Sequence, residues 1–181
     1  MSESSGSLLN EQKMLEVPRG RGTGAPLAFN ATPIYDAINQ IDQVRRATAV
    51  TSPDLMATFN LAMHTTSKLI SLIELEKSYA EASLRESKSV AILDRADALL
   101  AARNMKSTAD LREAVVNLDP DVVAAKERVD KLTTMLSFFT NTYYELREAL
   151  YSTKKICDIY LKLPNDPNTC LLYTSPSPRD S

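Results

Sequence analysis

The residues best suited to chemistry in this sequence are basic side chains gathered between positions 85 and 112. Lys88 and Arg95 are seven residues apart, so they share one face of an α-helix, and Arg103 follows eight residues later. A stripe of cations on a helix can line the phosphate backbone of a nucleic acid. We therefore predict a DNA-binding surface, with an ordinary solvated helix face as the alternative; its residues are Lys88, Arg95, Arg103, Lys106 and Arg112.

Catalytic chemistry has little support in the sequence. His64 is the only histidine, so any Ser-His or Cys-His arrangement would have to use it. Cys157 falls on an apolar helical stripe, where a cysteine acts as a small hydrophobic residue rather than a nucleophile. Neither a glycine-rich phosphate loop nor a zinc-ligand spacing occurs. We therefore predict a protein that is not an enzyme, with no catalytic residue, metal or cofactor.

Long helices are expected to position the basic residues. The chain of 181 residues contains only 4 glycines and no tryptophan, and neither Pro nor Gly occurs between Asp54 and Arg103. Ser52-Pro53-Asp54 supplies a helix start, with a cap, a proline at the first position and an acid in the first turn. At ~1.5 Å per residue this helix is about 75 Å long. Such a length is typical of a coiled coil or a hairpin arm.

A second long helix is predicted from Pro120 to about Leu163, with Asp119 as its cap. Its apolar stripe advances by alternating steps of three and four, through Val129, Leu132, Leu136, Phe139, Tyr143, Leu146, Leu150, Thr153, Cys157 and Tyr160. A single stripe is stable only against a partner. We therefore predict an all-α fold, a long antiparallel helical hairpin that resembles a coiled coil.

Shorter elements complete the predicted organisation. A short N-terminal helix is expected from Thr32-Pro33 to about residues 48–51, and Ser107 is expected to cap a helix over residues 108–116. Residues 1–31 are rich in Ser and Gly, which predicts a disordered arm whose Arg19 and Arg21 add a flexible basic contact. The helical domain is expected to cover residues 32–163, and residues 164–181 to form an unstructured tail.

The final residues resemble translated sequencing-adaptor read-through. Residues 170–175 match what a transposase mosaic end encodes, and residues 176–180 match the adaptor arm that follows it. We therefore expect the genuine coding sequence to be interrupted near Thr169, short of the true C-terminus, with a natural Pro/Ser-rich tail as the alternative, and we assign no function to residues 170–181. Cys157 then stands alone, which is typical of a reducing cytosol.

Aromatic side chains on the second long helix exceed what one stripe can bury. Phe138, Tyr144 and Tyr151 are therefore predicted to form a partner surface, and we expect a homo-oligomer. A net charge of −2 provides no global field for an anionic membrane. No run of eighteen apolar residues occurs, so we expect no membrane partner and a cytoplasmic location.

Two blocks of this sequence resemble the UvsY-like family of phage recombination mediators, over about residues 69–160. One block is Lys88-Ser89-Val90-Ala91-Ile92-Leu93-Asp94-Arg95, with Ala98-Leu99-Leu100 after it. The other is Leu118-Asp119-Pro120-Asp121-Val122, which opens an amphipathic arm that ends in Lys154-Lys155-Ile156. The resemblance implies a small, self-assembling helical protein in which Lys88 and Arg95 contact single-stranded DNA.

Two functions are therefore kept as expectations. The first is an accessory single-stranded-DNA-binding protein of phage recombination or replication, acting in the host cytoplasm. By resemblance its other partners are a recombinase and a single-strand-binding protein. The second is a structural or scaffold helical hairpin, such as a virion or assembly component, that binds only protein.

Overall fold

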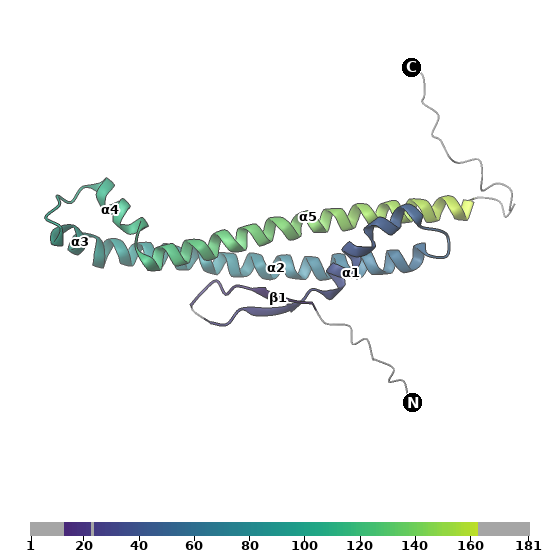
Figure 1. Cartoon of the computed structure of the whole chain (residues 1–181), viewed down its shortest axis with the longest axis horizontal. Coiled ribbons are helices and arrows are strands. Elements are labelled where there is room, and N and C mark those ends of the chain that lie inside the picture. The colour runs from purple at the N-terminus through teal and green to yellow at the C-terminus, as the bar shows by residue number, and fades with distance from the viewer. Residues whose placement is uncertain (1–12, 23, 163–181) are drawn as a thin grey trace, which may run out of the picture.

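Two long antiparallel helices dominate the computed structural model, which describes residues 13–22 and 24–162. The first arm runs without interruption through α2 (Ser52–Val90), the π-helical segment η2 (Ala91–Ala96) and α3 (Asp97–Ala102). The second arm is α5 (Pro120–Lys162), which lies beside α2 along most of its length (Figure 1). The prediction of an all-α antiparallel hairpin is confirmed.

The core between the arms consists of two facing stripes. On α2 the buried residues follow a regular three–four spacing: Ser52, Leu55, Phe59, Ala62, Thr66, Leu69, Ile73, Glu76 and Ala80. On α5 the buried residues are Val122, Ala125, Leu132, Phe139, Thr142, Leu146, Ala149 and Thr153. The predicted stripe is therefore present, but Val129, Leu136, Tyr143, Leu150 and Cys157 are half-buried at its edge and Tyr160 is exposed.

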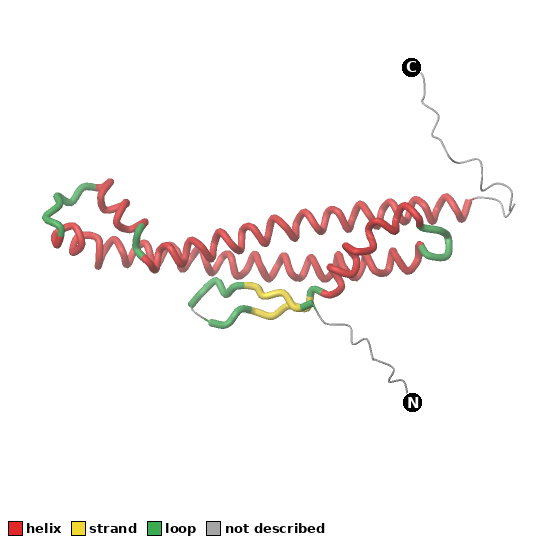
Figure 2. The backbone as a smooth tube through the Cα atoms, in the orientation of Figure 1, coloured by secondary structure: helices red, strands yellow, loops and turns green. Residues whose placement is uncertain are grey.

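The tip of the hairpin contains a turn and a short helix, drawn at one end of Figure 2. α3 is followed by a turn at Asn104, which adopts a left-handed φ of 52°. The Met105 N–H donates to the Leu100 carbonyl and the Asn104 N–H to that of Ala101, which is a Schellman ending. α4 (Ala109–Asn117) is capped by Thr108, whose hydroxyl accepts from the Leu111 N–H, and not by Ser107 as predicted.

At the opposite end, the N-terminal helices cover the open mouth of the hairpin. α1 (Thr32–Gln40) continues into the 3₁₀ segment η1 (Ile41–Arg46). Ala37 and Val44 join a buried cluster with Phe59 of α2 and Leu146 of α5. This region therefore forms a third layer over the two arms.

The prediction of a disordered arm over residues 1–31 is wrong for the part that the structure describes. β1 (Met14–Val17) and β2 (Leu27–Asn30) pair antiparallel, with Val17 opposite Leu27. A lone two-stranded hairpin is marginal in water, but packing against a helix stabilises it. Here Val17 is fully buried in one cluster with Leu69, Ile73 and Leu132. Residues 1–12 and the predicted tail, residues 164–181, lie outside the described residues.

Candidate nucleic-acid interface

The five predicted DNA-binding residues all lie toward the tip of the hairpin. Lys88 is in the last turn of α2, Arg95 in η2, Arg103 at the end of α3, Lys106 in the turn and Arg112 in α4. All five are exposed to solvent. Their side chains nevertheless divide into two groups by the contacts that they make.

Arg95 belongs to the first group because it is bound by two carboxylates. Its Nη1 lies 2.9 Å from Asp119 Oδ2 and 2.8 Å from Asp121 Oδ2. Asp119 also caps α5, since its Oδ1 accepts a hydrogen bond from the Asp121 N–H at 3.0 Å. The side chain of Asp119 is only 6% exposed, whereas that of Arg95 is 44% exposed. This ion pair therefore fastens the first arm to the start of the second.

The contact changes the protonation equilibria of both partners. Hydrogen bonding from Arg95 lowers the pKa of Asp119, although desolvation acts in the opposite direction. Hydrogen bonds to Asp121 and then Asp119 raise the pKa of Arg95 above its ordinary value. Both groups are therefore charged at neutral pH, and each is already paired with the other.

Arg112 is held in the same way by Asp97. Its Nε donates to Asp97 Oδ1 at 2.9 Å and its Nη2 to Asp97 Oδ2 at 3.1 Å, a two-point contact. Nε also lies 2.7 Å from the Ser107 hydroxyl, which itself donates to Asp97. This network joins α3 to α4 and closes the tip.

Lys88, Arg103 and Lys106 form the second group. Within the described residues none of them makes an ion pair. Their exposed cations are therefore open to a phosphate, whereas a strand that binds Arg95 or Arg112 must first compete with a carboxylate. We refer to Lys88, Arg103 and Lys106 as the tip cations.

The π-helical segment explains why Arg95 reaches carboxylates on the second arm whereas Lys88 does not. The prediction that they share a face assumed an uninterrupted α-helix, but η2 begins at Ala91 and includes Arg95. A π-helical turn closes i to i+5 and is wider than an α-helical turn. A seven-residue spacing that crosses it no longer returns to the same face.

The ion pairs of Arg95 and Arg112 were not predicted from the sequence. Their carboxylate partners are Asp97, Asp119 and Asp121. Asp119 was recognised only as a helix cap. Asp-Pro-Asp at a helix start does signal local negative charge, but its arginine partner is 24 residues away in sequence. Only the hairpin geometry brings the two together.

An apolar depression of about 360 Å³ adjoins the tip cations. Its lining includes Leu99, Leu100, Met105, Leu111 and Val115, with Arg103 also among its lining residues. Leu118, which also lines this depression, and Leu93 in η2 are each 79% exposed. A contiguous apolar depression with exposed leucines is a candidate contact surface for another protein.

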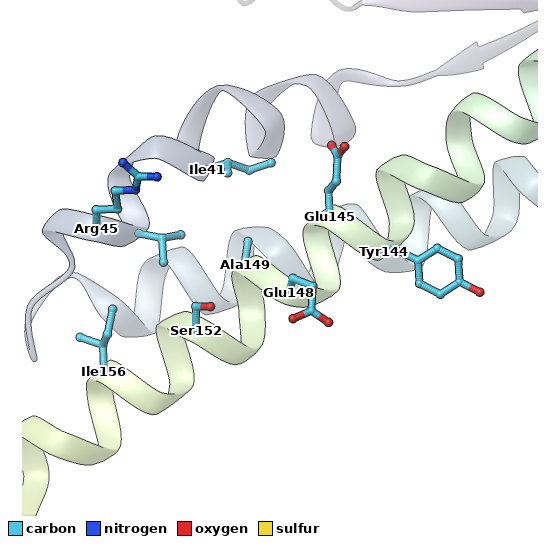
Figure 3. Close-up of a pocket in the computed structure, with 9 residues that line it drawn as sticks. Ile41, Arg45, Tyr144, Glu145, Glu148, Ala149, Ser152 and Ile156 are labelled. Atoms are coloured by element: carbon cyan, nitrogen blue, oxygen red, sulfur yellow. The ribbon is translucent and has the colours of Figure 1, made fainter. Parts of the chain in front are cut away.

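The predicted partner surface on α5 is exposed. Phe138, Tyr144 and Tyr151 have exposed fractions of 52%, 54% and 53%. A separate groove of about 620 Å³ lies between η1 and α5, where Tyr144 points away from Ile41 and Ile156 (Figure 3). The three aromatic side chains are therefore available to a partner, and Tyr144 borders the groove.

The described residues offer no group of three His, Cys, Asp or Glu side chains that could hold a metal ion. His64 is exposed on α2, and Cys157 is a half-buried free thiol. In the part of the chain that the structure covers, no helix is long and apolar enough to cross a membrane. Comparison with protein-family models, curated protein sequences and solved structures finds no match to this chain.

Proposed function

We propose that this chain is a non-catalytic accessory protein that binds single-stranded DNA in phage recombination or replication. The observation that carries the proposal is the set of tip cations, which are exposed and make no ion pair within the described residues. The resemblance of residues 88–100 and 118–122 to UvsY-like mediators supplies the class of ligand. It also implies that a recombinase and a single-strand-binding protein are partners.

We assign binding to a smaller set of residues than the sequence predicted. Lys88, Arg103 and Lys106 contact the strand, whereas Arg95 and Arg112 hold the tip in shape through Asp119, Asp121 and Asp97. With few aromatic side chains at the tip, binding depends on phosphate contacts and is largely independent of base sequence. Assembly through Phe138, Tyr144 and Tyr151 would repeat the tip around an oligomer and strengthen binding through linked sites.

The test measures the affinity for a labelled oligothymidylate at two salt concentrations. The tip variant combines Lys88→Ala, Arg103→Ala and Lys106→Ala. We expect its affinity at low salt to fall at least tenfold. The slope of log affinity against log salt should decrease by about 2, because each phosphate contact on a single strand contributes roughly 0.7.

The matched control replaces three exposed cations at the other end of α5: Lys154, Lys155 and Lys162. It removes the same charge, so a general loss of positive potential would weaken both variants equally. Equal loss in the two variants, or a parent protein that binds no strand, would contradict the proposed site. Circular dichroism of both variants checks that the helices remain.

A second function is favoured by the apolar tip. In this alternative the chain is a structural or scaffold hairpin that binds only protein, and the depression around Leu99, Met105 and Leu111 is its contact surface. Measuring the affinity of one further variant for DNA distinguishes the two functions. A Leu111→Ser variant should keep its affinity for DNA if the tip cations are the site, whereas the scaffold function predicts no DNA binding by any form.

A further inference from the structure

The loop between β1 and β2 is seated tightly on the long helices. Gly20 lies against α2 so closely that a Cβ there would be 2.0 Å from the Glu76 carbonyl oxygen and 2.7 Å from the Ala80 nitrogen. Its N–H donates to Glu76 Oε2 at 2.7 Å. Gly20, which was predicted to belong to a flexible arm, is therefore held against α2.

Glu76 explains why the loop binds at this position. It occupies a core position of the α2 stripe, and its side chain is only 6% exposed. A carboxylate at such a site needs hydrogen bonds or a cation to offset its desolvation. The Gly20 N–H supplies the hydrogen bond, and Arg19 Nη1 lies 3.9 Å from Glu76 Oε1. The buried acid therefore fixes the loop and, with it, Arg19.

Seating the loop brings cations from distant parts of the chain together. Arg19, Arg128 and Lys131 line one depression of about 310 Å³, together with Glu16 and with residues Pro18, Gly22, Gly24 and Pro26. Arg21 lines an adjoining depression with Arg19. The depression therefore carries three cations against one carboxylate of its own lining, Glu16, although Arg19 is also paired with Glu76 on α2. We refer to Arg19, Arg21, Arg128 and Lys131 as the loop cations.

Arg128 has unused hydrogen-bonding capacity. Its Nη1 lies 3.5 Å from the Gly22 carbonyl oxygen, at the limit of a hydrogen bond. Its Nε is buried and has no hydrogen-bond partner within the described residues. Glu86 and Asp121 line a further depression beside Arg128, but neither makes an ion pair with it. A buried donor without a partner calls for an explanation, and an anion in the neighbouring depression would supply one.

We infer that the loop cations form a second phosphate-binding site for the nucleic-acid strand, separate from the tip cations. The inference rests on the proposed function, because the ligand is the same strand. Phosphate fits the chemistry best, since arginine forks and a lysine ammonium bind its oxygens with charge-assisted hydrogen bonds. The loop site lies nearer the middle of the hairpin than the tip cations do.

The test compares variants for affinity to oligothymidylate at two salt concentrations. Arg128→Ala with Lys131→Ala removes the helix half of the site. We expect about tenfold weaker binding at low salt and a salt slope smaller by about 1.4, at roughly 0.7 per phosphate contact. A second double variant, Arg21→Ala with Lys131→Ala, leaves the Arg128–Gly22 contact intact and guards against a loop that no longer folds.

The control is Lys154→Ala with Lys155→Ala, which removes the same charge from exposed positions far along α5. Loop variants that bind within twofold of this control, with helicity unchanged, overturn the loop site. If those variants bind normally but the tip variant does not, only the loop site fails. If the loop variants lose affinity while the tip variant binds normally, the proposed tip site fails and the loop site stands. A parent that binds no strand overturns both.

Discussion

The middle of the helical hairpin and its tip are stabilised by different forces. In the middle, large side chains such as Phe59, Leu69 and Leu132 are fully buried between α2 and α5. At the tip, most of the buried residues are small: Ala91, Ala96, Val116 and Val122 form one cluster, and Leu100 of α3 is also buried. Ion pairs from the partly exposed side chains of Arg95 and Arg112 also hold the tip together.

This difference separates stability from recognition. Burial of apolar surface is insensitive to moderate salt, whereas exposed ion pairs are screened by it. We therefore expect the tip, which carries the tip cations and the apolar depression, to open more readily than the middle of the hairpin. Regions that bind partners are commonly drawn from the less stable parts of a protein.

The largest expected effect comes from the middle of the hairpin. Leu132→Ala removes a fully buried side chain and should lower the free energy of unfolding by about 2–5 kcal/mol. Leu118→Ala at the tip is the matched control, because Leu118 is 79% exposed, and it should change stability by less than about 0.5 kcal/mol. Urea denaturation measures both. Similar losses in the two variants would remove the contrast between middle and tip.

A smaller effect is expected where the loop meets α2. Gly20→Ala forces a methyl group into the Glu76 backbone and should cost about 1–3 kcal/mol, the usual range for overpacking. Gly24→Ala is the control, because a Cβ there meets only Arg19 Cγ, at 3.8 Å. Thermal unfolding distinguishes the two. An unaffected Gly20 variant would show that the loop is not seated as described.

The ion pairs at the tip should make it sensitive to pH. The pKa of Asp119 is lower in the folded protein than its ordinary value of 3.8. The stabilisation from its charge is therefore complete above the ordinary pKa and is lost as the pH falls through the lowered one. Hydrogen exchange of α4, corrected for intrinsic rates, should accelerate as acid is added while the middle of the hairpin stays protected.

Asp119→Asn isolates the charge, because asparagine retains the ability to cap a helix. In the variant, hydrogen exchange of α4 should already be fast at neutral pH, and it should change little as the pH is lowered. Asp94→Asn is the control, since Asp94 lies next to Arg95 in the η2 segment and makes no ion pair among the described residues. Identical exchange in the two variants would contradict the role of Asp119.

The smallest effect on stability is expected for the aromatic surface of α5. Tyr144 and Tyr151 are half-exposed, so replacing both with serine should leave the unfolding of a single chain almost unchanged. If these residues join copies of the chain, the sedimentation coefficient should fall. An unchanged assembly with the double variant would exclude these tyrosines as the contact.

The long helices could be predicted from the sequence because their signals are local. The stripe through Leu132, Phe139 and Leu146 and the starts at Pro53 and Pro120 need no tertiary information. The strands could not be predicted, because Met14–Val17 and Leu27–Asn30 are short and are stabilised by packing on helices far along the chain.

The candidate site was predicted only in part for a similar reason. The positions of Lys88, Arg103 and Lys106 follow from their place near the hairpin turn. The ion pair between Arg95 and Asp119 depends on a π-helical turn and on a contact across the hairpin. Neither feature can be recognised from the neighbouring residues in the sequence. Arg128 was overlooked because its neighbour Gly22 is 106 residues away.

The separation of 106 residues between Gly22 and Arg128 determines when the loop can make its contacts during synthesis. Closing a long loop costs more entropy than pairing adjacent helices, so contacts between neighbours form first. The loop around Gly20 leaves the ribosome before α2 and long before Arg128. It docks on Glu76 once α2 is made, but its contact with Arg128 can form only after α5 has begun to fold back. The loop site is therefore completed only late in folding, although it includes some of the first residues to be made.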